Sequence, residues 1–456
     1  MTSARRRLGF LPLVGVVFCL SSSGPFGIEE MVAASGPGLT ILMLLAIPLL
    51  YGLPLGLAVG EMNGRFPVEG GYYRWIRAVF GDVWGFQAGW GAWLGSFFDG
   101  AAYAVLVAEY LQPLLHMTPM AGILDAHPFL ARQAICLGVI GSCTLANLRG
   151  IKLVGWSTLV FMIFVISPFV VMCAMGATHW EHNPMLPIKH PDIGWGPALG
   201  IGAMLCMWNY SGYESLSTAA EEIEDPRRNY FKAVLISICL SVPIYLLPML
   251  TMLATTPDWT ALKAGAYPAA AGFIGGPALG VWVGLAGAVS NLALFNAYTL
   301  VYSRIPFAMA QDGFLPKALC RTHARFGTPW VSLLFGAAVY SLLTFLSFAE
   351  LIVMEVWLFS VIYILIYLAL WVLRRREGGG PPAAAPGGEV RFTLPLGSRG
   401  IWLVIGPPIL LILAGMFGSG PEYILFGGLA LASGPAILGI SRIIRRLRRA
   451  RSTGAA

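Results

Sequence analysis

The chain has 456 residues, of which 57% are hydrophobic and 11% are charged. Soluble domains usually contain about 25% charged residues, so this composition excludes an ordinary soluble protein and predicts an all-α integral membrane protein. The formal net charge of +7 does not indicate nucleic-acid binding, because the basic residues follow a membrane-orientation pattern described below. The seven cysteines lack paired spacing, so neither a disulfide framework nor a metal motif is expected.

Apolar runs long enough to cross a bilayer recur along the chain, and about 20 residues are needed for roughly 30 Å of hydrocarbon. Twelve such runs are predicted, at residues 8–33, 38–62, 82–114, 131–148, 152–178, 196–222, 230–255, 277–311, 329–347, 350–373, 400–418 and 421–442. The spans 82–114 and 277–311 are long enough to be tilted or to extend beyond the bilayer.

Lysine and arginine sort strongly between the predicted loops. With a cytoplasmic N-terminus, only Arg132, Lys189 and Lys263 fall outside, and the other 26 of 29 basic residues fall inside. This bias predicts a plasma-membrane protein with both termini in the cytoplasm. The basic C-terminal tail is expected to touch anionic membrane lipid and not nucleic acid.

Two of the predicted spans are interrupted by small and polar residues. The first contains SSSGPFG, with Ser23, Gly24, Pro25 and Gly27, and the sixth contains WNYSGYES, with Gly212. Paired interruptions at corresponding places in two halves are typical of a binding site at the membrane midplane. Glycine and proline are common in membrane helices, so either break alone would mean little. The pair, with a carboxylate after each break, favours a binding site.

Several longer motifs carry a resemblance to a known family. GPFGIEE, FPVEGGYYRWIRAVFGDVWGFQAGW, NLRGIKLVGWSTLV and WNYSGYESLSTAAEEIEDPRRNYFKAV resemble the amino acid–polyamine–organocation transporter superfamily, and within it the polyamine uptake transporters of plants and protists. The resemblance implies secondary active transport and a LeuT-type fold, a 5+5 inverted repeat with discontinuous first and sixth helices and two further C-terminal helices. The expected organisation is a cytoplasmic N-terminus (1–7), two repeats (8–178 and 196–373), a flexible cytoplasmic linker (374–399), two last spans (400–442) and a basic tail (443–456).

Acidic residues inside a predicted span are candidates for function, because a charge at a helix centre costs about 2.5–3.5 kcal/mol. Glu29 and Glu30 lie about 100° apart on a helix, so we expect one to face a cavity, with Glu29 favoured for substrate and Glu30 for support. Asp99 shares a helix face with Tyr103 and Tyr110. A carboxylate beside aromatic rings suits an ammonium group, although Asp99 could instead be a helix-packing residue.

The second break adds Glu214, which is flanked by Trp208, Asn209 and Tyr213. The resemblance implies an acidic substrate-binding residue at Glu214 and another at Asp99. The candidates for proton coupling are Glu29, Asp99 and Glu214.

Other polar residues are expected to have smaller roles. Asn291, Asn296 and Tyr298 could line the transport route, although an asparagine in a membrane helix more often bonds to a neighbouring helix. Acids near span ends, where water lowers the cost of a charge, are expected to be structural: Glu61, Glu109, Glu221 and Glu222. No Lys, Arg or His lies in the middle of a predicted span, so a proton relay would have to use carboxylates or water. The outer-loop histidines are not expected to hold a metal.

These features together predict a cationic substrate. Pro25 removes a backbone donor from the break that holds the substrate carboxylate in amino acid members of the superfamily. The acids that follow would repel a carboxylate and favour ammonium groups. We expect proton-driven import of putrescine, cadaverine, spermidine or spermine by a monomer or weak homodimer, with no cofactor and no enzymatic activity. An amino acid permease or exchanger for cationic or neutral amino acids, and a transporter-like sensor, are the alternatives.

Overall fold

The computed structural model describes residues 9–21, 24–66, 71–149, 157–212, 224, 226–256, 258–377, 393–394 and 396–453. All regular elements in these residues are helical. The α-helices are α1 (Phe10–Ser21), α2 (Glu30–Ser35), α3 (Pro37–Ile47), α4 (Leu53–Arg65), α5 (Gly71–Phe80), α6 (Asp82–Leu115), α7 (Ala121–Ala126), α8 (Pro128–Leu148), α9 (Ser157–Gly176), α10 (Trp195–Asn209), α11 (Pro226–Thr255), α12 (Tyr267–Gly275), α13 (Pro277–Gln311), α14 (Trp330–Leu343), α15 (Phe348–Arg376), α16 (Trp402–Gly418) and α17 (Pro421–Thr453). A π-helical turn, η1 (Pro48–Gly52), joins α3 to α4, and short 3₁₀ turns, η3 (Trp259–Ala261) and η4 (Lys317–Cys320), lie in loops.

Seven helical stretches among the described residues are long and apolar enough to cross a membrane. They are Pro37–Arg65, Asp82–Leu115, Pro128–Leu148, Asn229–Thr255, Pro277–Gln311, Phe348–Arg376 and Pro421–Ser441. Three shorter apolar helices add to them: Val160–Gly176, Trp330–Leu343 and Trp402–Gly418. The chain is therefore an all-α, multi-pass membrane protein, which confirms the class predicted from composition.

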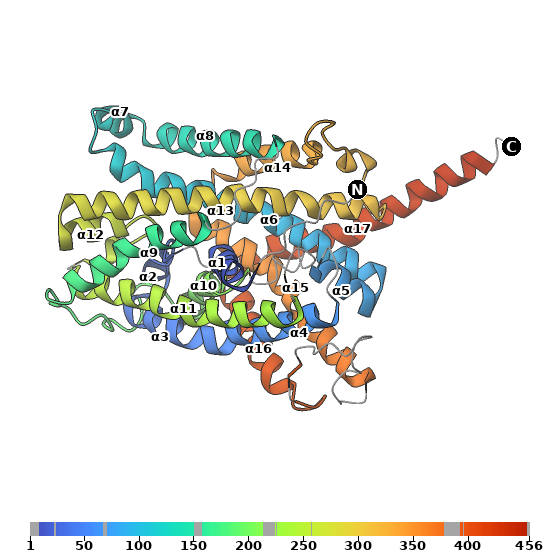
Figure 1. Ribbon diagram of the computed structural model, residues 1–456, viewed down its shortest axis with the longest axis horizontal. Helices are drawn as coiled ribbons and strands as arrows, with labels where there is room; N and C mark the ends of the chain where they lie inside the picture. The colour runs from blue at the N-terminus through green and yellow to red at the C-terminus, as the bar shows by residue number, and fades with distance from the viewer. Residues whose placement is uncertain are drawn as a thin grey trace.

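The long helices run along the long axis of the molecule (Figure 1). The helices α6 and α13 pack against each other over much of their length and run in opposite directions. Two short helices mark the ends of the bundle, because α5 lies at one end and α12 at the other (Figure 1). These ends are called the α5 end and the α12 end below.

Small residues let α6 approach its neighbours closely. A methyl group on Gly95 would lie 2.7 Å from the ring of Phe359 in α15, and one on Gly100 would lie 2.6 Å from the ring of Tyr340 in α14. Membrane helices associate largely through such close packing, since lipid supplies little hydrophobic drive between them. The glycines thereby set α6 at the centre of the bundle, where its side chains can meet those of several helices.

In the first and sixth predicted spans, the helices end at the predicted interruptions. In the run 8–33, α1 ends at Ser21 and α2 begins at Glu30; the described residues between them include Gly24 and Gly27, whose φ angles are 107° and 83°. In the run 196–222, α10 ends at Asn209, and Gly212 has a φ of 88°. Ser23, Tyr213 and Glu214 lie outside the described residues.

Candidate functional site

Asp99 lies in the middle of α6 and is 2% exposed. Its Oδ1 accepts a hydrogen bond of 2.9 Å from the indole nitrogen of Trp208, at the end of α10. Its Oδ2 accepts one of 2.6 Å from the hydroxyl of Tyr302 in α13. Both donors are neutral, so these bonds orient the carboxylate without cancelling its charge.

Aromatic rings enclose this carboxylate. One helical turn beyond Asp99, the ring of Tyr103 stacks on Tyr298 with centroids 5.5 Å apart and lies 5.7 Å from the ring of Trp208. The ring of Tyr298 in turn stacks on Tyr302 at 5.0 Å. A carboxylate surrounded by π-faces provides both charge and cation–π attraction for an ammonium group.

Glu29, at the end of the first break, is fully buried. Its Oε1 accepts a hydrogen bond from the hydroxyl of Tyr110, which lies near the end of α6. The same hydroxyl accepts a bond of 3.3 Å from the backbone N–H of Gly27. The other oxygen of Glu29, Oε2, is buried and has no hydrogen-bond partner among the described residues. A buried acceptor in this condition is costly, and an amine donor would relieve the cost.

The backbone of the first break and the Asp99 carboxylate lie on either side of the same side chain, the indole ring of Trp208. A methyl group on Gly27 would lie 2.6 Å from the ring of Phe348 and 3.5 Å from Cζ3 of Trp208. Trp208 also packs edge-on against Phe348 at 5.6 Å and donates to Asp99. The ring of Trp208 therefore lies between the broken backbone and the Asp99 carboxylate.

Glu30 has a different partner from its neighbour Glu29. Its Oε2 accepts a hydrogen bond of 2.9 Å from the backbone N–H of Ala264, in the loop before α12. The two adjacent acids thus point to different places, Glu29 to Tyr110 on α6 and Glu30 to a loop at the α12 end.

The predicted asparagines do not join the Asp99 cluster. The side chains of Asn209 and Asn291 donate to carbonyls one turn back on their own helices, at 3.0 and 2.9 Å. Asn296 accepts a 2.9 Å bond from Asn147, which links α13 to α8. Of the predicted route-lining residues, Tyr298 stacks within the Asp99 cluster and Tyr110 bonds Glu29. Tyr302 was not predicted, although its position one turn after Tyr298 was a usable signal.

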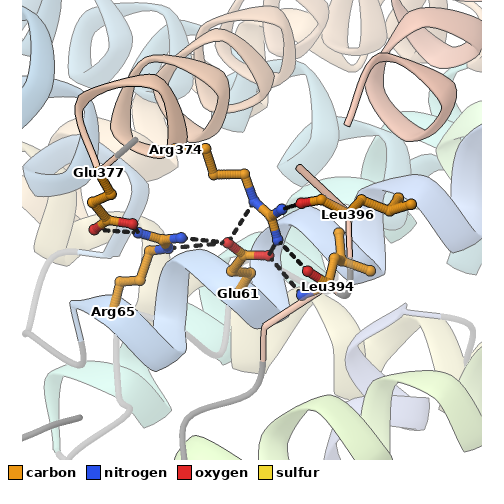
Figure 2. Close-up of polar contacts among 6 residues, drawn as sticks. All are labelled: Glu61, Arg65, Arg374, Glu377, Leu394 and Leu396. Carbon is orange, nitrogen blue, oxygen red and sulfur yellow. Dashed lines mark hydrogen bonds and ion pairs between the residues drawn. The ribbon is translucent and has the colours of Figure 1, made fainter. Parts of the chain in front are cut away.

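A buried ionic network lies at the α5 end and centres on Glu61 of α4 (Figure 2). Glu61 is fully buried, so the expected solvated position at a span end is wrong. Its carboxylate accepts a bond of 2.7 Å from Arg65, one of 2.9 Å from Nε of Arg374 in α15, and one of 3.0 Å from the backbone N–H of Leu394. Arg65 also binds both oxygens of Glu377 at 2.7 Å. The network joins α4, the end of α15 and the segment that leads to α16.

The remaining acids and histidines form no metal site in the described part of the chain, where no three His, Cys, Asp or Glu side chains are suitably grouped. Glu109 is paired with Arg132 at 3.3 Å. Glu221 and Glu222 lie outside the described residues.

Comparison with known proteins identifies the family. The model of the amino acid permease family matches residues 9–431. A protein of Arabidopsis thaliana named as a probable polyamine transporter is 33% identical over 417 residues, which cover 91% of this chain and 79% of that protein. A polyamine transporter of Oryza sativa subsp. japonica is 32% identical over 416 residues, 90% of this chain and 74% of its own. An uncharacterized transporter of Mycobacterium tuberculosis is 30% identical over 351 residues, 74% of this chain and 73% of its own. The chain is therefore a transporter and not an enzyme, and it belongs to the amino acid permease family.

Proposed function

We propose that this permease imports polyamines of the putrescine, cadaverine, spermidine and spermine class, coupled to proton entry, by alternating access. The observation that carries the proposal is the pair of buried carboxylates, Asp99 and Glu29, whose side-chain hydrogen-bond partners described above are neutral and aromatic. Buried carboxylates need a compensating positive charge, and a substrate with ammonium groups supplies it. The similarity to polyamine transporters named in two plants supports the same substrate class.

The separation of the two sites supports an extended substrate. Asp99 and Tyr110, the partner of Glu29, are about 16 Å apart along the axis of α6, at roughly 1.5 Å per residue. Helical side chains lean toward the N-terminus of the helix, which brings the Tyr110 hydroxyl back toward Asp99. A linear amine with charges at both ends can approach both carboxylates. A compact amino acid carries a carboxylate of its own, which Asp99 and Glu29 would repel.

A proton can replace the amine as the compensating charge when the site releases its substrate. Glu29, Asp99 and Glu214 are the proposed proton carriers, since buried carboxylates can exchange a proton for a bound cation. Glu214 follows the second break in the sequence, and we propose it as a further amine ligand together with Tyr213.

Two matching helix pairs support the 5+5 inverted repeat. The short helix α5 precedes α6, of 34 residues, and the short helix α12 precedes α13, of 35 residues. Both long helices begin after a glycine of positive φ, Gly81 at 86° and Gly276 at 83°. The two short helices lie at opposite ends of the bundle, as inversion requires (Figure 1). We propose twelve spans in all, with α16 and α17 following the repeats.

Basic residues support a plasma-membrane orientation with the α5 end and both termini in the cytoplasm. Arg65, Arg77 and Arg374 all lie in helices or helix ends at the α5 end, in agreement with the inside bias of positive charge.

Uptake into proteoliposomes tests the proposal. Radiolabelled putrescine and spermidine should accumulate above the level of empty vesicles when the outside medium is more acidic than the lumen, and a protonophore should abolish the gain. No uptake above empty vesicles would contradict the substrate, and uptake insensitive to the protonophore would contradict proton coupling.

Membership of the amino acid permease family favours a second candidate, an amino acid permease or exchanger. Competition of labelled spermidine with unlabelled arginine and leucine separates the two functions. Counterflow then separates a transporter from a sensor, because a sensor binds without exchange.

A further inference from the structure

One more acid lies in the membrane-spanning part of the chain, in α15. Glu355 is 5% exposed. Between Glu350 in the first turn of this helix and Arg374 in its last turn, Glu355 is the only acidic or basic residue. A charged group at that depth is costly and is a functional candidate by default.

The packing register of α15 against α6 places Glu355 opposite Asp99. A methyl group on Gly91 would lie 3.8 Å from the carbonyl of Leu358 and 3.9 Å from Ile362, and one on Gly95 would lie 2.7 Å from Phe359. The numbers rise on α6 as they fall on α15, so the two helices are antiparallel in this region. One further turn, about 6 Å along each axis, leads from Gly95 to Asp99 on α6 and from Phe359 to Glu355 on α15.

The face of α15 that carries Glu355 also lines the Asp99 cluster. Phe348, Glu355 and Phe359 follow the spacing of one helix face, and Phe348 packs on Trp208 at 5.6 Å. The carboxylates of Glu355 and Asp99 both lie within electrostatic range of the hydroxyl groups of Tyr103 and Tyr302. Register, face and electrostatic range agree in placing both carboxylates in one buried cluster.

Two carboxylates buried together at low dielectric repel each other, and each positive charge that binds there relieves part of that repulsion. We propose that Glu355 is a specificity-determining residue: Asp99 binds one ammonium group of the substrate, and Glu355, on the facing helix, binds the neighbouring one. The site thereby selects amines with two or more charges over monoamines and zwitterions. This inference rests on the proposed function and deepens it.

The test compares two inhibitors of labelled spermidine uptake that share a four-carbon chain, putrescine with two ammonium groups and butylamine with one. In the wild-type protein, putrescine should inhibit more strongly than butylamine. In Glu355→Gln, the inhibition constant of putrescine should rise about tenfold, as for the loss of one charge-assisted bond, while that of butylamine should stay within about twofold. Glu355→Asp, which keeps the charge, should restore most of the preference. Glu422→Gln, an exposed acid at the start of α17, is the matched control and should behave as wild type.

The outcomes separate this inference from the function on which it rests. If wild-type vesicles do not take up spermidine, or if arginine competes better than putrescine, the proposed function is wrong. If wild-type uptake is normal but Glu355→Gln weakens inhibition by putrescine and by butylamine equally, or weakens neither, then Glu355 does not bind the second ammonium group. If Glu355→Gln only lowers the maximal rate with both inhibition constants unchanged, its role is structural and the inference is overturned.

Discussion

The indole nitrogen of Trp208 donates a 2.9 Å hydrogen bond to Oδ1 of Asp99, although 109 residues separate the two in the chain. This contact ties the last turn of α10 to the middle of α6. Because the helix of α10 ends one residue later, at Asn209, movement of the second break would move the donor relative to the carboxylate.

Replacing Trp208 separates the roles of its ring and its donor. Trp208→Phe keeps an aromatic face but removes the bond to Asp99. We expect the Michaelis constant for spermidine to rise about tenfold or more, because one hydrogen bond to a charged group contributes about 1.5 kcal/mol or more. Trp208→Ala also removes the ring and should raise the constant further. Equal effects of the two substitutions would show that the donor alone matters.

Asp99→Asn should weaken polyamine binding more than any other single neutral substitution on α6. The amide keeps the shape but removes the charge that an ammonium group would meet, so we expect affinity to fall by about tenfold to a hundredfold. Binding of unlabelled spermidine, followed by thermal shift of the purified protein, measures this loss without requiring transport. Unchanged affinity would remove Asp99 from the substrate site.

The neighbouring acids Glu29 and Glu30 should respond differently to the same change. Glu29→Gln should reduce uptake strongly and alter its dependence on external pH, because Glu29 lies in the break with an unmatched acceptor oxygen. Glu30→Gln should chiefly loosen the loop at Ala264, leaving the pH profile of uptake in its wild-type shape. Profiles measured with a pre-set pH gradient decide the question, and an altered profile in Glu30→Gln alone would reverse the assignment.

Gly27→Ala should impair transport even though it adds only a methyl group. The methyl would lie 2.6 Å from the ring of Phe348, and the φ of 83° disfavours a residue with a Cβ. Gly81 has a similar φ of 86° but has nothing within 4 Å of the added methyl, so Gly81→Ala is the matched control for backbone strain alone. Equal loss of uptake in both variants would assign the defect to strain and not to the contact with Phe348.

Removing the centre of the ionic network should destabilise the protein without changing substrate preference. Glu61→Gln leaves Arg374, which is 4% exposed, without its carboxylate partner, and breaking a buried pair costs about 3–5 kcal/mol. Glu377→Gln breaks the outer pair, whose acid side chain is 35% exposed, and should cost no more than about 1 kcal/mol. The Tm in detergent measures both variants, and a smaller loss for Glu61→Gln than for Glu377→Gln would contradict this ranking.

Much of the fold could be predicted because hydropathy reports directly on membrane helices: the predicted spans 82–114 and 277–311 match α6 and α13 within one residue. The site was harder to predict, because Glu355 lies far in the sequence from both helix breaks. Yet Glu355 lies inside the predicted span 350–373, where the cost of a buried acid was already a sufficient signal. The burial of Glu61 depends on Arg374, 313 residues away. Such a pairing leaves no local pattern in the sequence.

The Glu61 carboxylate binds the side chain of Arg374 on one side and the backbone of Leu394 on the other. The end of α15 and the approach to α16 are therefore attached to one group on α4, independently of the peptide chain between them. The helix α16 also packs on α10 and α4. If the chain were cut between Glu377 and Leu394, the two fragments should therefore remain associated and co-purify. The contacts that hold them together are the bond from Leu394 to Glu61 and the packing of α16 on α10 and α4.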